Sequence, residues 1–106
     1  MYARTVSMSV KAGAVEAFTL LIESEIIPLL RCLEGFQDAL TLIVPGGREA
    51  IGISLWSRRT DADRYGRGTD KEVMKRVGLL LDGLGTAKTF QLSNSTFHKI
   101  GTHVPL

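Results

Sequence analysis

Residues 36–57 read FQDALTLIVPGGREAIGISLWS, and this stretch decides the fold. At its centre, Pro45-Gly46-Gly47-Arg48 is a strong turn signal, because its glycines can adopt a positive φ that other residues avoid. Apolar residues recur with a period of two in the runs before and after the turn. We therefore predict a β-hairpin whose strands cover 36–44 and 49–57.

Residues on the N-terminal side of the hairpin predict a strand followed by a helix. Side chains alternate in character over 2–10, as in a strand with two unlike faces. Pro28 lacks the amide that would bond the Ser24 carbonyl, so we expect a kink or break within the helix. Gly35 is suited to end the helix in a left-handed turn. Over 14–34 the apolar residues recur at helical spacing and form a core stripe of Val15, Phe18, Ile22, Ile26, Leu29 and Leu33.

Residues after the hairpin predict a second helical region. Residues 60–65 can form a short helical turn that Thr60-Asp61 caps and that Gly66 and Gly68 interrupt. Thr69-Asp70-Lys71-Glu72 has the form of a capping box, so a longer helix begins there. Its apolar positions are Val73, Val77, Leu80, Leu81 and Leu84, and glycines close it.

Residues 87–95 alternate in polarity and predict the last strand, while 96–106 form a tail without a clear period. The complete order is strand, helix, strand, strand, helix, strand. This order is typical of the ferredoxin-like β-α-β-β-α-β unit, an α+β fold with a four-stranded antiparallel sheet and two main helices on one face. We expect a single domain over 1–106, because the chain is short.

Composition excludes several classes of function. The 106 residues carry a net charge of +2 with scattered basic side chains, so we expect no nucleic-acid binding. Cys32 is the only cysteine, which excludes an intrachain disulfide and a multi-thiolate metal site. His98 and His103 lie in the tail without further ligands, so we expect no metal. The apolar runs are too short to cross a membrane and no signal peptide precedes Tyr2, so we expect a cytoplasmic protein.

The strand periodicities divide the predicted sheet into two faces. One face is apolar and can seat the helices; its members are Val6, Met8, Val10, Phe36, Leu40, Leu42, Val44, Ile51, Ile53, Leu55, Phe90 and Leu92. The other face contains no charged residue; its members are Ala3, Thr5, Ser7, Ser9, Gln37, Ala39, Thr41, Ile43, Ala50, Gly52, Ser54, Trp56, Thr89, Gln91 and Ser93. A sheet face in water normally carries Lys and Glu, so we expect a second copy of the chain to cover this one in a homodimer. A wet, threonine-rich face on a monomer is the alternative.

Three short motifs add a family likeness. Gly35-Phe36 marks the junction of helix and strand, Leu55-Trp56-Ser57 ends the third strand, and Asp61-Ala62-Asp63-Arg64-Tyr65 opens the next helix. With these motifs, residues 2–95 resemble the antibiotic-biosynthesis-monooxygenase-like proteins of the dimeric α+β barrel superfamily. The resemblance implies a dimer whose sheets face each other, with the helices outside and a pocket in each subunit between sheet and helices.

Trp56 and Glu25 are the first candidate site residues. The resemblance implies that Trp56 lines the substrate pocket, where an indole can stack on a flat aromatic ligand. The alternative is that Trp56 fills the dimer core. On a helical wheel Glu25 falls near the apolar stripe, beside Phe18, Leu29 and Cys32. A carboxylate there could act as a base toward an acidic phenol or enol, whereas a Glu at the rim of the buried face would reach water.

Polar side chains near the expected pocket are further candidates. Tyr65, with Arg64 and Arg58, could orient a phenolate or carboxylate at the mouth of the pocket. The alternative is a tyrosine ring that packs on the sheet while both arginines stay solvated. Ser7 and Ser9 would present hydroxyl groups to a cavity, although small polar residues are equally expected in a tight interface between sheets.

Two functions remain open. In the first, the resemblance implies a cofactor-independent monooxygenase: an enzyme group removes a proton from a small aromatic phenol or enol, and the carbanion reacts directly with dioxygen. Trp56, Tyr65 and Glu25 would then hold and activate the substrate. In the second, the chain is a non-catalytic ligand-binding or stress-associated module of the same fold. We do not expect haem degradation, because that branch of the superfamily uses a first-strand asparagine and a second-helix histidine, which this chain lacks.

Overall fold

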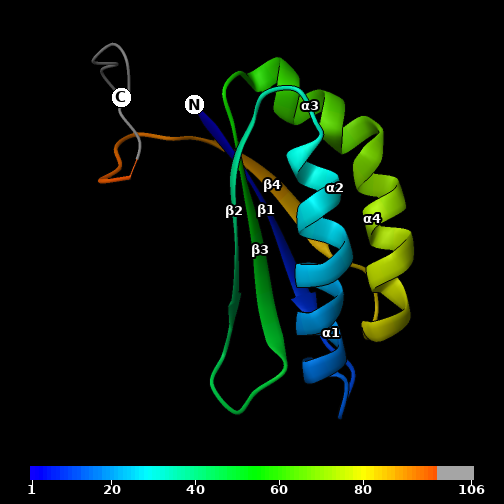
Figure 1. Cartoon of the computed structure of the whole chain (residues 1–106). Helices are drawn as coiled ribbons and strands as arrows, with labels where there is room; N and C mark the ends of the chain where they lie inside the picture. Colours follow the sequence, from blue (N-terminus) through cyan, green and yellow to red (C-terminus); the bar gives the residue numbers. More distant parts are fainter. Residues whose placement is uncertain (98–106) are drawn as a thin grey trace.

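Residues 1–97 are described by the computed structural model, and they form one sheet layer and one helix layer (Figure 1). The sheet consists of β1 (Tyr2–Ser9), β2 (Phe36–Ile43), β3 (Glu49–Trp56) and β4 (Thr86–Gln91). Its strand order is β2-β3-β1-β4, and neighbouring strands are antiparallel. The described helices lie on one side of the sheet (Figure 1), so the predicted ferredoxin-like α+β fold is confirmed.

The helix layer has two parts. After β1 come α1 (Val15–Leu21), a π-helical turn η1 (Ile22–Ile26) and α2 (Ile27–Arg31). After β3 come α3 (Arg59–Arg67), α4 (Thr69–Val77) and a 3-10 turn η2 (Gly78–Leu80). Most of the predicted tail lies outside the described residues, and His98 and His103 lie outside them too.

The π-helical turn changes which residues of the first helix are buried. The amide of Ile27 bonds the carbonyl of Ile22, five residues earlier, directly before Pro28, which has no amide to donate. The wider turn contains an extra residue, so Leu30 is buried in place of Leu29, which is half-buried. The regular α-helix is interrupted near Pro28 as predicted. Leu29 and Leu33 of the predicted apolar stripe still pack against the core, but Leu30, which the stripe left out, is the more deeply buried residue.

The second helical region also differs from its prediction. α3 is continuous through Gly66 and ends at Gly68. At its start the Asp61 side chain accepts the backbone amide of Arg58 at 3.2 Å, which satisfies one donor of the helix terminus. No side chain caps α4, because Gly68 occupies the N-cap position and Thr69 is already the first residue of the helix, while Glu72 contacts Arg76. The predicted capping box over 69–72 is therefore wrong.

The two faces of the sheet are composed differently from the prediction. Cross-strand partners share a face in an antiparallel sheet. The rows that face the helices are Phe36, Trp56, Tyr2 and Gln91; Ala39, Ser54, Arg4 and Thr89; Thr41, Gly52, Val6 and Ala87; and Ile43, Ala50 and Met8. The opposite side, which we call the open face, carries Asp38, Leu55, Ala3 and Phe90; Leu40, Ile53, Thr5 and Lys88; Leu42, Ile51, Ser7 and Thr86; and Glu49 and Ser9. The set predicted to be one uncharged face is thus a mixture of both.

A β-bulge explains the error on β2. Phe36 pairs with Trp56 while Asp38 pairs with Leu55, so Gln37 is an additional residue on this strand. One extra residue reverses the face of every side chain that follows it. Leu40 therefore lies on the open face, although strict alternation from Phe36 places it against the helices.

On β3 the prediction fails because it assigns the larger apolar side chains to the helices. Small residues of β3 face the helices instead, and Trp56 at the strand's end, 1% exposed, is the large exception. The open face consequently carries exposed apolar side chains: Leu40, Leu42, Ile51 and Phe90 are 51, 53, 41 and 50% exposed. The sequence analysis expected a partner because one face lacked charged residues. In the structure the reason to expect a partner is instead the exposed apolar surface of the open face.

Candidate functional site

A cavity that is partly open to solvent lies between the sheet and the helices. Strands β1 to β3 form one side of it, and η1, α2, α3 and α4 form the other. Small residues on the sheet, Ala39, Gly52 and Ser54, leave this space where larger side chains would fill it. A Cβ at Gly52 would already reach Cε of Met8 at 3.4 Å. A pocket between sheet and helices is therefore present, as predicted.

The lining of the cavity is mostly apolar, and apart from Thr41 its polar residues form one group. Its apolar walls include Val6, Met8, Ile26, Leu30, Val73 and Val77. The polar residues Arg4, Ser54, Tyr65 and Asp70 also line it, from β1, β3, α3 and α4. Arg4 and Ser54 share a row of the sheet, so this polar group lies toward the Trp56 end of the cavity. Apolar walls with a few convergent polar groups are typical of small-molecule sites.

Arg4 and Asp70 form an ion pair within this group. Nη2 of Arg4 lies 2.9 Å from Oδ2 of Asp70, and the two side chains are 15% and 13% exposed. The guanidinium packs against Gly66 of α3, where a Cβ would lie 2.9 Å from Nη1 of Arg4. Gly66 is unfavourable inside a helix, and its presence makes room for the ion pair. Nε of Arg4 is buried and has no hydrogen-bond partner among the described residues.

Tyr65 completes the polar group. The centre of its ring lies 5.9 Å from Cζ of Arg4, within the range of a cation–π interaction. Burial raises the pKa of the Tyr65 hydroxyl, and the neighbouring Asp70 carboxylate raises this pKa further. The hydroxyl therefore stays protonated at neutral pH and can donate a hydrogen bond to an oxygen of a ligand.

Trp56 lies behind Tyr65 as seen from the cavity. The two rings stack with their centres 4.9 Å apart, and Phe36 meets the indole edge-on at 5.6 Å. The indole Nε1 donates to Oγ of Ser54 at 2.9 Å. Trp56 also lines a second hollow of about 380 Å³, shared with Tyr65 and Arg64. It packs on the helix side of the sheet, so the alternative that Trp56 fills a core between two sheets is wrong.

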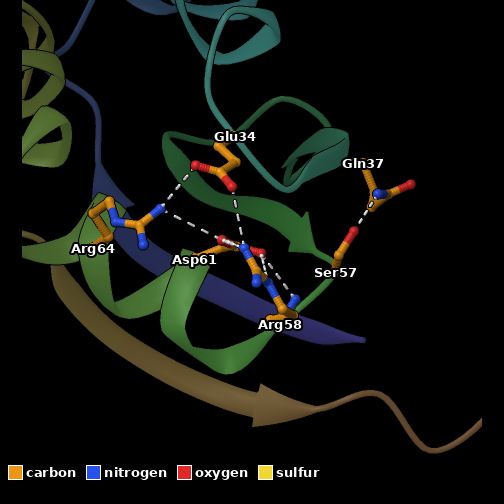
Figure 2. Close-up of polar contacts among 6 residues, drawn as sticks. All are labelled: Glu34, Gln37, Ser57, Arg58, Asp61 and Arg64. Carbon is orange, nitrogen blue, oxygen red and sulfur yellow. Dashed lines mark hydrogen bonds and ion pairs between the residues drawn. The ribbon is translucent and has the colours of Figure 1, made fainter.

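Arg58 and Arg64 belong to an ion-pair network near this second hollow (Figure 2). Arg58 contacts Asp61 at 3.1 Å and Glu34 at 3.3 Å, and Arg64 contacts Glu34 at 3.4 Å. The hydrogen bond from Arg58 lowers the pKa of the Asp61 carboxyl, while Asp61 in turn raises the pKa of Arg58. Both arginines thus already have carboxylate partners, and their predicted role in binding a ligand stays a prediction.

The same network is tied to the helix-to-strand junction. Gly35 has the predicted positive φ, +81°, but it lies in the turn before β2 and does not end the helix, because α2 ends at Arg31 with Cys32 as its cap. A Cβ at Gly35 would collide with the Asp61 carboxylate. The amide of Ser57 donates to the Gly35 carbonyl at 2.8 Å, and Gln37 donates to the Ser57 hydroxyl (Figure 2). The residues that carried the family likeness are therefore in contact with one another.

Glu25, Ser7 and Ser9 do not line the cavity. Glu25 lies in the π-helical turn, where it is exposed and pairs with Arg76 of α4 at 3.2 Å. Of its two interpretations, only the one in which Glu25 reaches water at the rim of the buried face fits this position. Ser7 and Ser9 lie exposed on the open face, so of their two interpretations only the one that involves an interface between sheets fits their position.

Arg4 and Asp70 are the site residues that sequence analysis missed. Arg4 is a charged residue among the apolar even positions of β1, and this exception was the available signal. Asp70 gave no such signal, because an acidic residue in the first turn of a helix is expected for local reasons. Only the packing of α4 over β1 brings the two together.

Among the described residues, no group of three or more His, Cys, Asp or Glu side chains is placed to hold a metal ion. Within the same part of the chain, the helices are too short or too polar for any of them to cross a membrane.

Comparisons with known proteins find likeness in structure only. No protein-family model matches the chain, and a search of curated proteins finds no significant match. Among solved structures, the monooxygenase ActVA-Orf6 of Streptomyces coelicolor, in complex with the ligand nanaomycin D, superposes with a TM-score of 0.75 at 14% identity, covering 92% of each chain.

Two other solved structures are similar to the same degree. SnoaB of Streptomyces nogalater, a cofactor-independent oxygenase, gives a TM-score of 0.72 at 12% identity over 90% of this chain and 95% of its own. The haem degrader MhuD of Mycobacterium tuberculosis, with two haems bound, gives 0.73 at 14% identity over 91% and 99%. These likenesses confirm the predicted resemblance at the level of structure: the chain has the fold of the antibiotic-biosynthesis-monooxygenase-like proteins.

Proposed function

We propose that the chain binds a small, mostly apolar aromatic or enolic molecule in the cavity between sheet and helices. One observation carries this proposal: the cavity is lined mostly by apolar side chains, and Arg4, Ser54, Tyr65 and Asp70 form a polar group at one end of it. Met8 and Met74 add two thioethers to the lining, which interact favourably with aromatic rings. The protonated Tyr65 hydroxyl favours a ligand with an oxygen acceptor at the polar end.

The reaction that we propose is a monooxygenation without a cofactor. A phenol or enol loses a proton, the resulting carbanion reacts with dioxygen, and a CH₂ group becomes a carbonyl group with release of water. The fold shared with ActVA-Orf6 and with SnoaB supports this reaction type, since those proteins are a monooxygenase and a cofactor-independent oxygenase. The Trp56–Tyr65 stack would hold the hydroxyl of Tyr65 in place. A cytoplasmic location is part of the proposal, and a lone Cys32 fits a reducing compartment.

A homodimer through the open face is also part of this proposal. Leu40, Leu42, Ile51 and Phe90 are exposed there, and the charged Asp38, Glu49 and Lys88 stand among them on the same face. Mixed charges at the border of an apolar centre are typical of protein interfaces. A second copy of the chain can cover the open face with its own open face, so no other protein is needed.

The test combines binding with oxygen consumption. The probe is 1,8-dihydroxyanthrone, a flat phenol with an oxidisable CH₂ group. Binding is followed under argon by calorimetry and by the emission of Trp56, the only tryptophan of the chain. Oxygen uptake is then followed in air against the buffer rate. We expect saturable binding and uptake above that rate.

A matched pair of variants locates the site. Thr41 lines the cavity, whereas its neighbour Leu42 lies on the open face. Thr41→Phe should weaken binding at least about tenfold by filling the cavity, while Leu42→Phe should leave the cavity unchanged. Saturable binding without oxygen uptake across a panel of phenols supports the non-catalytic ligand-binding module instead. Equal binding by both variants would place the ligand outside the cavity.

A further inference from the structure

We propose that Asp70 is the proton acceptor of the cavity and that Arg4 is the positioning residue that holds it. This inference rests on the proposed function, and it names the base that sequence analysis assigned to Glu25. Among the described residues that line the cavity, Asp70 is the only one with a carboxylate, and Glu25 does not line the cavity. The other titratable or charged groups in the lining are Arg4 and Tyr65.

The ion pair has features of a group kept for function. A buried ion pair contributes little to stability and can often be replaced by apolar residues of similar volume. Here it also requires a glycine inside α3 and leaves Nε of Arg4 buried without a hydrogen bond. An orphaned buried donor is rare in native proteins, and retained examples call for an explanation. Binding of a ligand to the Arg4–Asp70 pair would explain why a charged pair stands in a mostly apolar cavity.

Arg4 orients the carboxylate of Asp70. Oδ2 contacts Nη2 of Arg4 at 2.9 Å, and the carboxylate also accepts the side-chain hydrogen bond of Tyr65. In the proposed step the carboxylate accepts the proton of the ligand: a C–H or O–H bond breaks, its electron pair stays on the ligand as an enolate or phenolate, and Asp70 becomes a neutral acid. No oxidant takes part in this step.

Arg4 and Tyr65 stabilise the charge that this step creates. Once Asp70 is neutral, the new oxyanion replaces its carboxylate as the partner of Arg4. The Tyr65 ring lies over the same guanidinium, and its hydroxyl, which burial and the hydrogen bond to Asp70 keep protonated, then donates to that oxyanion. The positive charge thus stays fixed while the negative charge moves from Asp70 to the ligand, as in preorganised electrostatic stabilisation.

Deuterium exchange tests this step apart from the reaction with oxygen. The CH₂ group of 1,8-dihydroxyanthrone exchanges its hydrogens in D₂O whenever the enolate forms, and mass spectrometry under argon measures the rate. We expect the wild type to accelerate exchange over buffer. Asp70→Asn should lower the protein's rate at least about 100-fold, the usual range for loss of a general base, while calorimetry still detects binding. Glu25→Gln is the matched control and should exchange as fast as the wild type.

Further variants keep the test decisive. Asp70→Glu should restore part of the exchange, because it returns a carboxylate. The double variant Arg4→Met/Asp70→Leu replaces the pair by apolar side chains and should fold and bind without exchange, even if Asp70→Asn does not fold. Wild-type exchange in Asp70→Asn, or loss of exchange in Glu25→Gln, would overturn the proposal. A wild type that binds and consumes oxygen without accelerating exchange would overturn it too, whereas a wild type that binds no anthrone contradicts the proposed function itself.

Discussion

The two faces of strand β3 differ in the size of their side chains and in what they contact. Toward the helices the strand presents Ala50, Gly52 and Ser54 before it ends in Trp56, and a cavity lies above them. Toward the open face it presents Ile51, Ile53 and Leu55, with no helix of the described residues over them (Figure 1). The side with larger apolar residues is thus the side without helices.

Hydrophobicity alone therefore does not identify the face of a small sheet that the helices cover. A face that encloses a ligand needs space, so its residues are small and some are polar. A face that packs against a second sheet needs large apolar side chains that interdigitate at about 10 Å separation. Large apolar side chains look more like an ordinary protein core than small and polar ones do. For that reason the sequence analysis assigned the large apolar side of β3 to the helices and the small side to the partner.

Among the variants that compare the two faces, Trp56→Ala should cause the largest loss of stability. Trp56→Ala deletes a side chain that packs on Tyr65 and Phe36, and we expect a loss of about 3–5 kcal/mol in the free energy of unfolding. Urea denaturation at several protein concentrations measures it. The matched open-face variant Ile51→Ala should cost less in dilute protein, and its cost should grow with concentration as dimers form. A cost of Ile51→Ala that is independent of concentration contradicts a partner on the open face.

Charge on the open face should have the next largest effect. Leu42→Lys/Ile51→Lys places two cations on neighbouring strands of that face, and we expect the dimer dissociation constant to rise at least about 30-fold, on the order of 2 kcal/mol. Light scattering coupled to size exclusion measures the molar mass. Leu20→Lys is the control, because Leu20 is equally exposed but lies on α1. If the wild type is a monomer at every accessible concentration, the interface does not exist.

Acid should have the smallest effect, and it should act only on the helix side. The pKa of the folded Asp61 carboxyl lies below its unfolded value because Arg58 donates to it. The resulting stabilisation is fully present above about pH 4, the unfolded pKa of an aspartate, and is lost as the pH falls through the folded pKa. Thermal melts between neutral pH and about pH 2 measure this loss. Asp61→Asn should be less stable at neutral pH and lose less on acidification; Asp63→Asn, in the same helix but partly exposed, should follow the wild type.

Local patterns were sufficient for the elements and their order. The turn at 45–48, the glycine at 35 and the helical spacing of residues 14–34 each depend on neighbours in sequence, so they were readable without coordinates. The faces were not readable, because the bulge at Gln37 and the π-helical turn before Pro28 each insert one residue and change every assignment beyond them. Gln37 does not signal such an insertion by its type, and Pro28 predicts an interruption of the helix but not the extra residue.

The ferredoxin-like order of strands and helices could be predicted from the amino-acid pattern, because strand and helix periods, turn glycines and short connections are local properties. Which side of the sheet holds the cavity, and which residues line it, depends on the packing of the folded chain. Arg4 and Asp70 are 66 positions apart, and their meeting depends on how α4 crosses β1 and on the space left by Gly66. Burial and ion pairing are properties of that packing, so a charged residue on a strand became a candidate site residue only after the chain was folded.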